Sequence, residues 1–226
     1  MTLEIFNIDN MTFSTHRKAN LIFADYIYEN LDFSWVDHYW DMLADGGVLI
    51  AMTDYHSVAE YKLYVQGLPD SRFVNWLIYK QEWGGTPKKG FPQKHDDILI
   101  FSKGEDFYWN KDAIQVPKAT AGTKLDKKGT GLKTPCSVFD DLGNFSTLDK
   151  ERVKDKTGKN VPWQKPLKLL RRLITPFVKE GDFIIDPFMG VGTCEVVAKE
   201  LGCDCVGIEY NQEIFELAKN RLKGDL

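Results

Sequence analysis

The chain lacks the sequence features of membrane proteins, of secreted proteins and of several large enzyme classes. No apolar run in its 226 residues approaches the length of about 20 that crosses a bilayer. The opening MTLEIFNIDN has neither the basic start nor the long apolar core of a signal peptide. The signatures GxSxG, HExxH and GxxxxGK(S/T) are absent, so the hydrolases and phosphate-binding proteins that carry them are not indicated. We expect no membrane partner.

Cysteine is also scarce. The four cysteines show no spacing typical of zinc ligands, so no metal site is predicted from them. Reduced, partly buried thiols are the expectation for such a chain, and they favour a cytoplasmic location.

An overall positive charge, which is typical of nucleic-acid-binding proteins, is missing as well: the net charge is −4. The charge is nevertheless unevenly distributed. Residues 1–110 hold 9 Lys and Arg against 16 Asp and Glu, residues 111–172 hold 15 against 7, and residues 173–226 hold 5 against 10. A basic segment between acidic ones suits a surface that attracts phosphates, although a solvated lysine-rich loop would show the same pattern.

What is present is enough apolar sequence, 43%, for one α/β domain with a modest extra element. A helix is predicted from Ser34 to the Gly46–Gly47 pair, and another from His56 to about Gln66. Short apolar or alternating runs predict strands at residues 3–9, 19–25, 48–52, 73–83 and 96–104. This alternation predicts a parallel sheet covered on both faces. Residues 103–162 show little hydrophobic period, so loops and short elements are expected there.

The most informative stretch is FIIDPFMGVGTCEVVAKELGCDCVGIEYN, residues 183–211. It predicts a buried strand, a turn, a helix from Thr193 and a second strand. Gly190 and Gly192 permit a tight turn and a close approach of the backbone to a ligand. Glu209 follows Gly190 by 19 residues, where sites of this kind place a carboxylate on ribose hydroxyls. An ordinary strand–turn–helix crossover is the alternative, but the combination favours a nucleoside cofactor.

The choice of cofactor depends on position 195. A dinucleotide fingerprint would carry a third glycine there, and this chain has Glu195. An anionic side chain is unfavourable beside a pyrophosphate at a helix N-terminus. S-adenosylmethionine has no phosphate and carries a positive sulfonium, so acidic neighbours suit it.

Several of these motifs resemble those of a known enzyme family. DPFMGVGT closely resembles the DPFxGSGT motif of amino-group DNA methyltransferases that use S-adenosylmethionine, with Val191 for the usual serine and Cys194 where a threonine often follows. PWQKPLKLLRRLI resembles the family's QKPLxLLxRLI helix, KHDDILIFSK its HExILxFSK strand, LADGGVLI its LKPGGxL turn and NIDNM its GDCL segment. The cofactor motif comes last in the chain, as in the permuted beta class, and the resemblance covers nearly the whole sequence.

The resemblance implies a Rossmann-like methyltransferase fold, circularly permuted, with a seven-stranded, mostly parallel sheet and a small irregular basic insert. Residues 1–102 and 163–226 would form the catalytic domain, and residues 103–162 the target-recognition region. The carboxyl ends of the strands at 19–25 and 183–186 should then be neighbours across the cofactor crevice.

The family's catalytic turn, Asp-Pro-Pro-Tyr, corresponds here to Asp25-Tyr26-Ile27-Tyr28. An exocyclic amine is a poor nucleophile because its lone pair is delocalised into the ring. Hydrogen-bond acceptors for both of its N–H groups pyramidalise the nitrogen and so make the lone pair available. Asp25 and the Tyr26 carbonyl would be those acceptors, and Tyr28 would stack on the flipped-out base. The two prolines, and with them two fixed φ angles, are missing. A lapsed site that binds DNA and cofactor without turnover therefore stays open, as does an RNA substrate.

The remaining assignments also come from the resemblance. Asp at the head of the turn is commoner in adenine-N6 enzymes than in cytosine-N4 enzymes, so adenine is preferred. Pro135–Cys136 matches the nucleophile of cytosine-C5 enzymes poorly, because it precedes the cofactor motif. A double-stranded DNA partner is implied, and the short insert leaves a homodimer open. The cofactor-binding residues implied are Asp9, Lys165, Pro166, Asp186, Phe188, Gly190, Gly192, Thr193, Glu209 and Tyr210. The phosphate contacts expected on DNA are Lys88, Lys89, Lys124, Lys127, Lys128 and Lys133.

Overall fold

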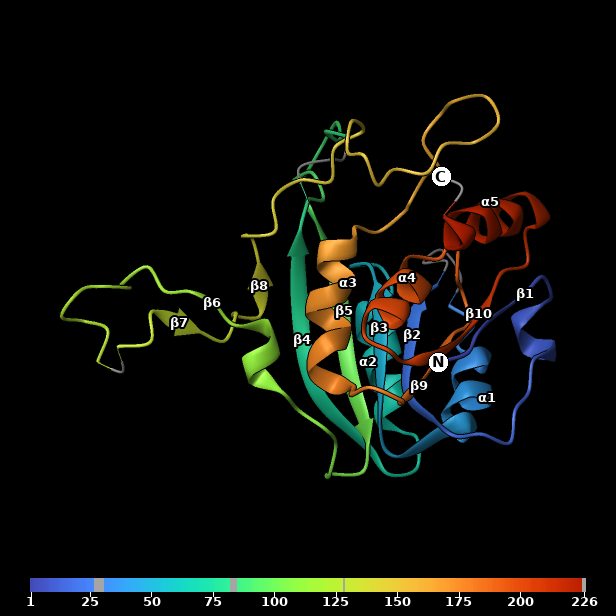
Figure 1. The fold of residues 1–226 in the computed structure, drawn as a ribbon, viewed down its shortest axis with the longest axis horizontal. Helices are drawn as coiled ribbons and strands as arrows, with labels where there is room; N and C mark the ends of the chain where they lie inside the picture. Colours follow the sequence, from blue (N-terminus) through green and yellow to red (C-terminus); the bar gives the residue numbers. More distant parts are fainter. Residues whose placement is uncertain (27–30, 82–84, 128, 225–226) are drawn as a thin grey trace.

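The computed structural model describes residues 1–26, 31–81, 85–127 and 129–224. Figure 1 shows a twisted sheet with helices on both faces and an arm that extends away from it. In the described ranges no helix is long and apolar enough to cross a membrane.

One sheet organises the molecule, in the strand order β1-β10-β9-β2-β3-β5-β4-β8. All neighbouring pairs are parallel except those of β5, which is antiparallel to β3 and β4. The strands are β1 (Leu3–Phe6), β2 (Ala19–Asp25), β3 (Leu43–Thr53), β4 (Ser71–Lys80), β5 (His95–Lys103), β8 (Val138–Phe139), β9 (Phe183–Asp186) and β10 (Asp204–Ile208). The sequence predicts seven strands. The additional strand is β8, a two-residue segment of the insert that pairs with β4.

The two ends of the chain assemble into this sheet as predicted. β2 lies directly beside β9, with Leu21 opposite Ile184 and Ile22 opposite Ile185. β1 pairs with β10 on the other side. The carboxyl ends of β2 and β9 are therefore neighbours, which confirms the predicted adjacency of these two strand ends.

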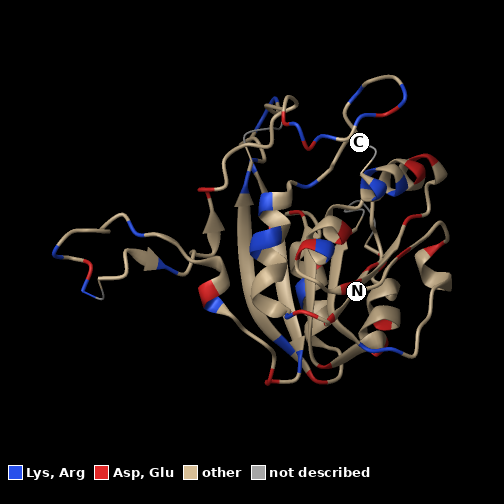
Figure 2. Cartoon of the chain, viewed as in Figure 1, with Lys and Arg blue, Asp and Glu red and all other residues tan. Residues whose placement is uncertain are grey.

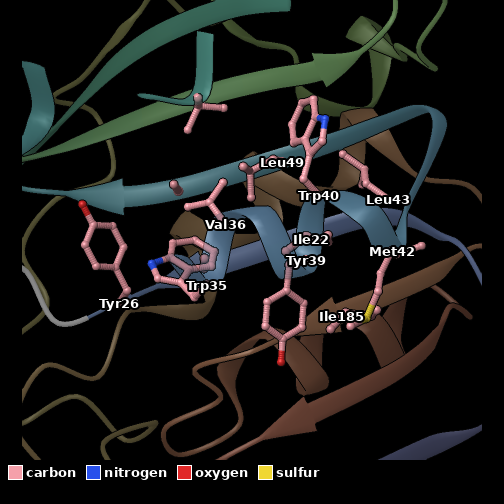
Figure 3. Packing of buried hydrophobic residues seen from close by; sticks show 14 of the residues in the cluster. Ile22, Tyr26, Trp35, Val36, Tyr39, Trp40, Met42, Leu43, Leu49 and Ile185 are labelled. Carbon is pink, nitrogen blue, oxygen red and sulfur yellow. The ribbon is translucent and has the colours of Figure 1, made fainter. Parts of the chain in front are cut away.

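Two apolar cores lie on the two faces of the sheet, because successive strand side chains point to opposite sides. Ile22 of β2 belongs to the core under α1 and α2, whereas Leu21 belongs to the core under α3 and α4. Figure 3 shows Trp35, Val36 and Tyr39 of α1 packed toward the sheet. The helices are α1 (Ser34–Met42), α2 (Val58–Gln66), α3 (Leu167–Ile174), α4 (Thr193–Glu200) and α5 (Gln212–Lys223), with short 3₁₀ turns η1 (Asn10–Thr12), η2 (Lys111–Ile114) and η3 (Thr175–Phe177).

The boundary between α1 and β3 differs from the prediction. The helix ends at Met42, and Gly46 and Gly47 lie inside the strand instead of terminating the helix. Gly46 has a φ of +74°, and a Cβ there would lie 2.4 Å from the carbonyl oxygen of Asp106. Glycine at this position therefore serves a close backbone approach within the sheet.

The insert forms loops and short elements, as predicted. Its small ribbon of β6 (Val116–Pro117) and β7 (Leu132–Lys133) lies on the projecting arm. Asp126 holds the tip together by accepting hydrogen bonds from Lys118 and from the Gly131 amide. A small apolar cluster joins the rest of the insert to the turn between β9 and α4 and to α5. It contains Val153 and Val161 of the insert and Val191 of the turn, with Ile214 and Leu217 of α5 against them.

Candidate active site

The glycine turn after β9 is built as the sequence predicts. Gly190 and Gly192 have φ values of +55° and +77°, in the left-handed region that favours glycine. The Gly190 amide donates to Glu209 Oε2 at 3.0 Å, and the Asn211 amide donates to Glu209 Oε1 at 2.7 Å. Burial raises the pKa of Glu209. A Cβ at Gly190 would meet no atom within 4 Å, so the turn faces open space.

Two buried carboxyls lie beneath that turn. Asp186, at the end of β9, accepts a hydrogen bond from the Phe188 amide at 3.0 Å, and burial together with Glu195 raises its pKa well above the usual range. Burial likewise raises the pKa of Glu195 to about 8. Glu195 Oε2 has no hydrogen-bond partner in the described part of the chain. Gly207 leaves room for this side chain, since a Cβ there would lie 2.3 Å from Glu195 Oε1.

Two further polar side chains, Tyr39 and Asp9, lie near these carboxyls. Tyr39 of α1 donates to the Asn10 carbonyl at 2.8 Å, and burial, with Asp186 and Asp9 nearby, raises its pKa. Asp9 caps η1 by accepting from the Met11 amide. The edge of the sheet at β1, β10 and β9 is thus acidic, and it is open above Gly190. This group of carboxyls suits a nucleoside cofactor that carries a positive charge better than one that carries phosphates.

Asp25 ends β2 on the same edge, where it contacts a lysine from a distant segment. Lys165 Nζ lies 3.2 Å from Asp25 Oδ1 and 3.5 Å from Asp96 Oδ2. Asp25 also contributes to the raised pKa of Asp186, after burial and Glu195, so the two strand-end carboxyls interact. The structure therefore brings together the acidic residues that the sequence assigns to catalysis and to the cofactor.

The turn after Asp25 is anchored by an aromatic side chain. Tyr26 is buried, its hydroxyl lies 3.0 Å from Thr53 Oγ1 and 3.4 Å from Ser57 Oγ, and its ring stacks on Tyr61 with centroids 5.3 Å apart. Burial is the main cause of its raised pKa. These contacts fix the start of the turn in place of the missing first proline. Tyr28 and Ile27 lie outside the described residues.

A cavity of about 590 Å³ opens next to Asp25. Its polar wall includes Lys165, Asp96 and Arg152, and its rim carries three exposed aromatic side chains: Tyr55, Phe91 and Trp163. Trp163 is 82% exposed and has a φ of +58°, which is rare for a bulky residue. Asp96 is not among the site residues predicted from the sequence, although the two acids that begin the buried DDILIF run are a usable signal. Nothing in the local sequence marks Trp163.

The lysines assigned to DNA fall into two groups. Lys88 and Lys89 are exposed in the β4–β5 connection, whose Pro87 and Phe91 line the cavity. A second group is exposed on the projecting arm, where Figure 2 shows basic residues along the loop. These are Lys124, Lys127 and Lys133. Lys128 lies outside the described residues. Cys136 is exposed in the insert and does not line the cavity.

Comparison with known proteins gives a consistent result. A family model described as DNA methylase, for the N6 and N4 enzymes, matches residues 8–220. The type II methyltransferase M.HpaI of Haemophilus parainfluenzae is 31% identical over 91% of this chain, which spans 62% of that protein's length. M1.MboII of Moraxella bovis is 31% identical over 82% of this chain, and the match covers 76% of the length of M1.MboII.

Solved structures share the fold at lower identity. The complex of M1.HpyAVI with S-adenosylmethionine superposes with a TM-score of 0.70 at 19% identity, covering 97% of this chain and all of that one. The cytosine-N4-specific PvuII DNA methyltransferase gives a TM-score of 0.67 at 13% identity, covering 98% and 86%.

Proposed function

The chain belongs to the family of amino-group DNA methyltransferases, and we propose that it methylates the N6 amine of a flipped-out adenine in double-stranded DNA. The family uses S-adenosylmethionine. The observation that carries the proposal is the meeting of Asp25 with the acidic glycine turn at one edge of the sheet, beside a cavity rimmed by aromatic side chains.

In this proposal the cofactor supplies an electrophilic methyl group carried on a positive sulfur. A positive sulfur beside Asp186 and Glu195 would lower their raised pKa values and so favour their ionised forms. Glu209 accepts from the ribose hydroxyls, and Asp9 lies toward the adenine amino group. Phe188, which packs edge-on against Trp35 with ring centroids 5.1 Å apart, lines the same side. The remaining cofactor contacts are those implied by the family resemblance: Lys165, Pro166, Gly192, Thr193 and Tyr210.

The target amine is activated by acceptors on the turn after β2. Asp25 and the Tyr26 carbonyl each accept one N–H, which localises the nitrogen lone pair and directs it toward the methyl group. The nitrogen loses one proton when the C–N bond forms, and we assign its acceptance to the Asp25 carboxylate. The base occupies the 590 Å³ cavity, where the rim aromatics offer stacking surfaces. Tyr28 keeps the stacking role that the family resemblance implies.

DNA would be held by its phosphates. Lys88 and Lys89 lie on the connection that borders the cavity, and the arm lysines extend the positive surface away from the sheet. A second copy of the chain would supply a further arm, and sedimentation of the protein with and without DNA tests this homodimer. A cytoplasmic location is part of the same proposal.

Transfer of a labelled methyl group from S-adenosylmethionine to unmethylated DNA tests the function, with RNA of the same sequence as the competing substrate. Incorporation into DNA that Asp25→Ala abolishes supports the proposal. Incorporation into RNA alone reassigns the substrate. Cofactor binding without transfer to either would indicate a lapsed site, for which the chain's one motivating feature is the loss of both prolines from the turn.

A further inference from the structure

A buried lysine between two carboxylates is the most unusual feature of the site. Asp25 comes from the end of β2, Asp96 from the start of β5, and Lys165 from the residue before the N-cap of α3. Their side chains are 19%, 10% and 10% exposed. Three segments far apart in the sequence therefore bring two acids and one base together, and two of these residues, Asp96 and Lys165, line the cavity.

The charges of this cluster depend on one another. Burial, and then Asp25, raise the pKa of Asp96, whereas Lys165 lowers it. Without the ammonium, two carboxylates would face each other in a partly desolvated site and would repel each other. This repulsion would move the Asp25 carboxylate away from the place that the proposed chemistry requires.

Tyr79, from β4, also lies within reach of this cluster. Burial is the main cause of its raised pKa of about 12, with Asp96 raising it and Lys165 lowering it. Arg152 stands farther along the same cavity wall. Lys165 thus has a carboxylate on either side. Movement of its ammonium away from either carboxylate would break an ion pair.

We propose that Lys165 and Asp96 are positioning residues for Asp25: Asp96 anchors the Lys165 ammonium, and the ammonium holds the Asp25 carboxylate in place beside the cavity. The proposal rests on the proposed function and deepens it. It gives Lys165 a role toward the base-activating carboxylate in addition to any contact with the cofactor, and it gives Asp96 a role that acts only through Lys165.

A double-mutant cycle separates this role from a cofactor contact. Lys165→Met removes the ammonium from between the two carboxylates and is expected to lower kcat by about 100-fold. Adding Asp96→Asn removes the second carboxylate and is expected to restore about tenfold of that loss. If Lys165 acted only on the cofactor, the double variant would be no better than Lys165→Met. That result would overturn the proposal.

Asp96→Asn alone provides a second test, which holds if Lys165→Met does not fold. It leaves the ammonium without its anchor, so kcat should fall about tenfold while the Kd for S-adenosylmethionine stays within about twofold. An unchanged kcat would contradict the anchor role. Asp97→Asn is the matched control, because Asp97 is the next residue of β5 and bonds to Trp76 on the opposite face. Wild-type protein that transfers no methyl group would refute the proposed function itself, independently of the cycle.

Discussion

Glu195 offers a quantitative prediction, because its buried carboxyl has an oxygen without a hydrogen-bond partner in the described structure. Its pKa is raised from 4.5 to about 8, chiefly by burial. Folding therefore favours the protonated form. The stability that this proton contributes is complete below about pH 4.5 and is lost as the pH rises toward 8. Glutamine keeps the shape of the side chain and removes the titration.

The magnitude follows from the two pKa values. A tenfold change in proton affinity corresponds to about 1.4 kcal/mol, so the cost of ionising Glu195 in wild type grows by about 3 kcal/mol between about pH 5.5 and about pH 8.5. The stability of Glu195→Gln relative to wild type should thus increase by about 3 kcal/mol between these pH values. The other titrating groups are shared by the two proteins, and Asp186 is the group whose contribution also changes, because Glu195 raises its pKa in wild type.

Urea unfolding followed by circular dichroism measures this difference at each pH by linear extrapolation. A pH-independent offset between the two proteins is compatible with the account, because the amide must find new partners. Parallel stability curves across the whole range would refute the reasoning, since they would mean that Glu195 ionises freely in the folded state.

Four further outcomes are expected. Asp25→Ala should keep cofactor binding, measured by calorimetry, while labelled transfer falls by about 100-fold or more; full transfer would contradict the chemistry assigned to it. Asp186→Ala should weaken cofactor binding about tenfold, and an unchanged Kd would remove Asp186 from the cofactor site. Gly207→Ala should lower the free energy of unfolding by about 1–3 kcal/mol, because its Cβ would lie 2.3 Å from Glu195 Oε1, and an unchanged Tm would contradict this. DNA affinity should fall steeply with salt, and glutamine at the arm lysines should flatten that slope; equal slopes would exclude the arm as a phosphate contact. The substitutions are at Lys124, Lys127 and Lys133.

The sequence predicts the positions of the strand-end acids well, and the reason is topological. Asp25 and Asp186 each follow a buried apolar run, and the carboxyl ends of neighbouring parallel strands meet at one edge of a sheet. The glycine turn is equally predictable, because positive φ angles at Gly190 and Gly192 leave few alternatives.

Features that depend on contacts between distant segments are not predictable in this way. The approach of Lys165 to Asp96 requires the start of α3 to meet the start of β5, and neither sequence contains that information. The end of α1 is another example. Gly46 and Gly47 have the local pattern of a helix stop, but they lie inside β3, and Gly46 is needed there because the Asp106 backbone approaches closely. Tyr26 likewise anchors its turn through Thr53 and Tyr61, which no local pattern connects to it.

The most direct test of the central claim is the identity of the methylated nucleoside. Unmethylated genomic DNA is incubated with the protein and S-adenosylmethionine, digested to nucleosides and analysed by mass spectrometry, with Asp25→Ala in parallel. We expect N6-methyladenine in DNA treated with the wild-type protein and none in DNA treated with the variant. N4-methylcytosine would keep the mechanism and reverse the choice of base, whereas no methylated nucleoside, or equal amounts with the variant, would contradict the assignment of Asp25 as the group that activates the amine.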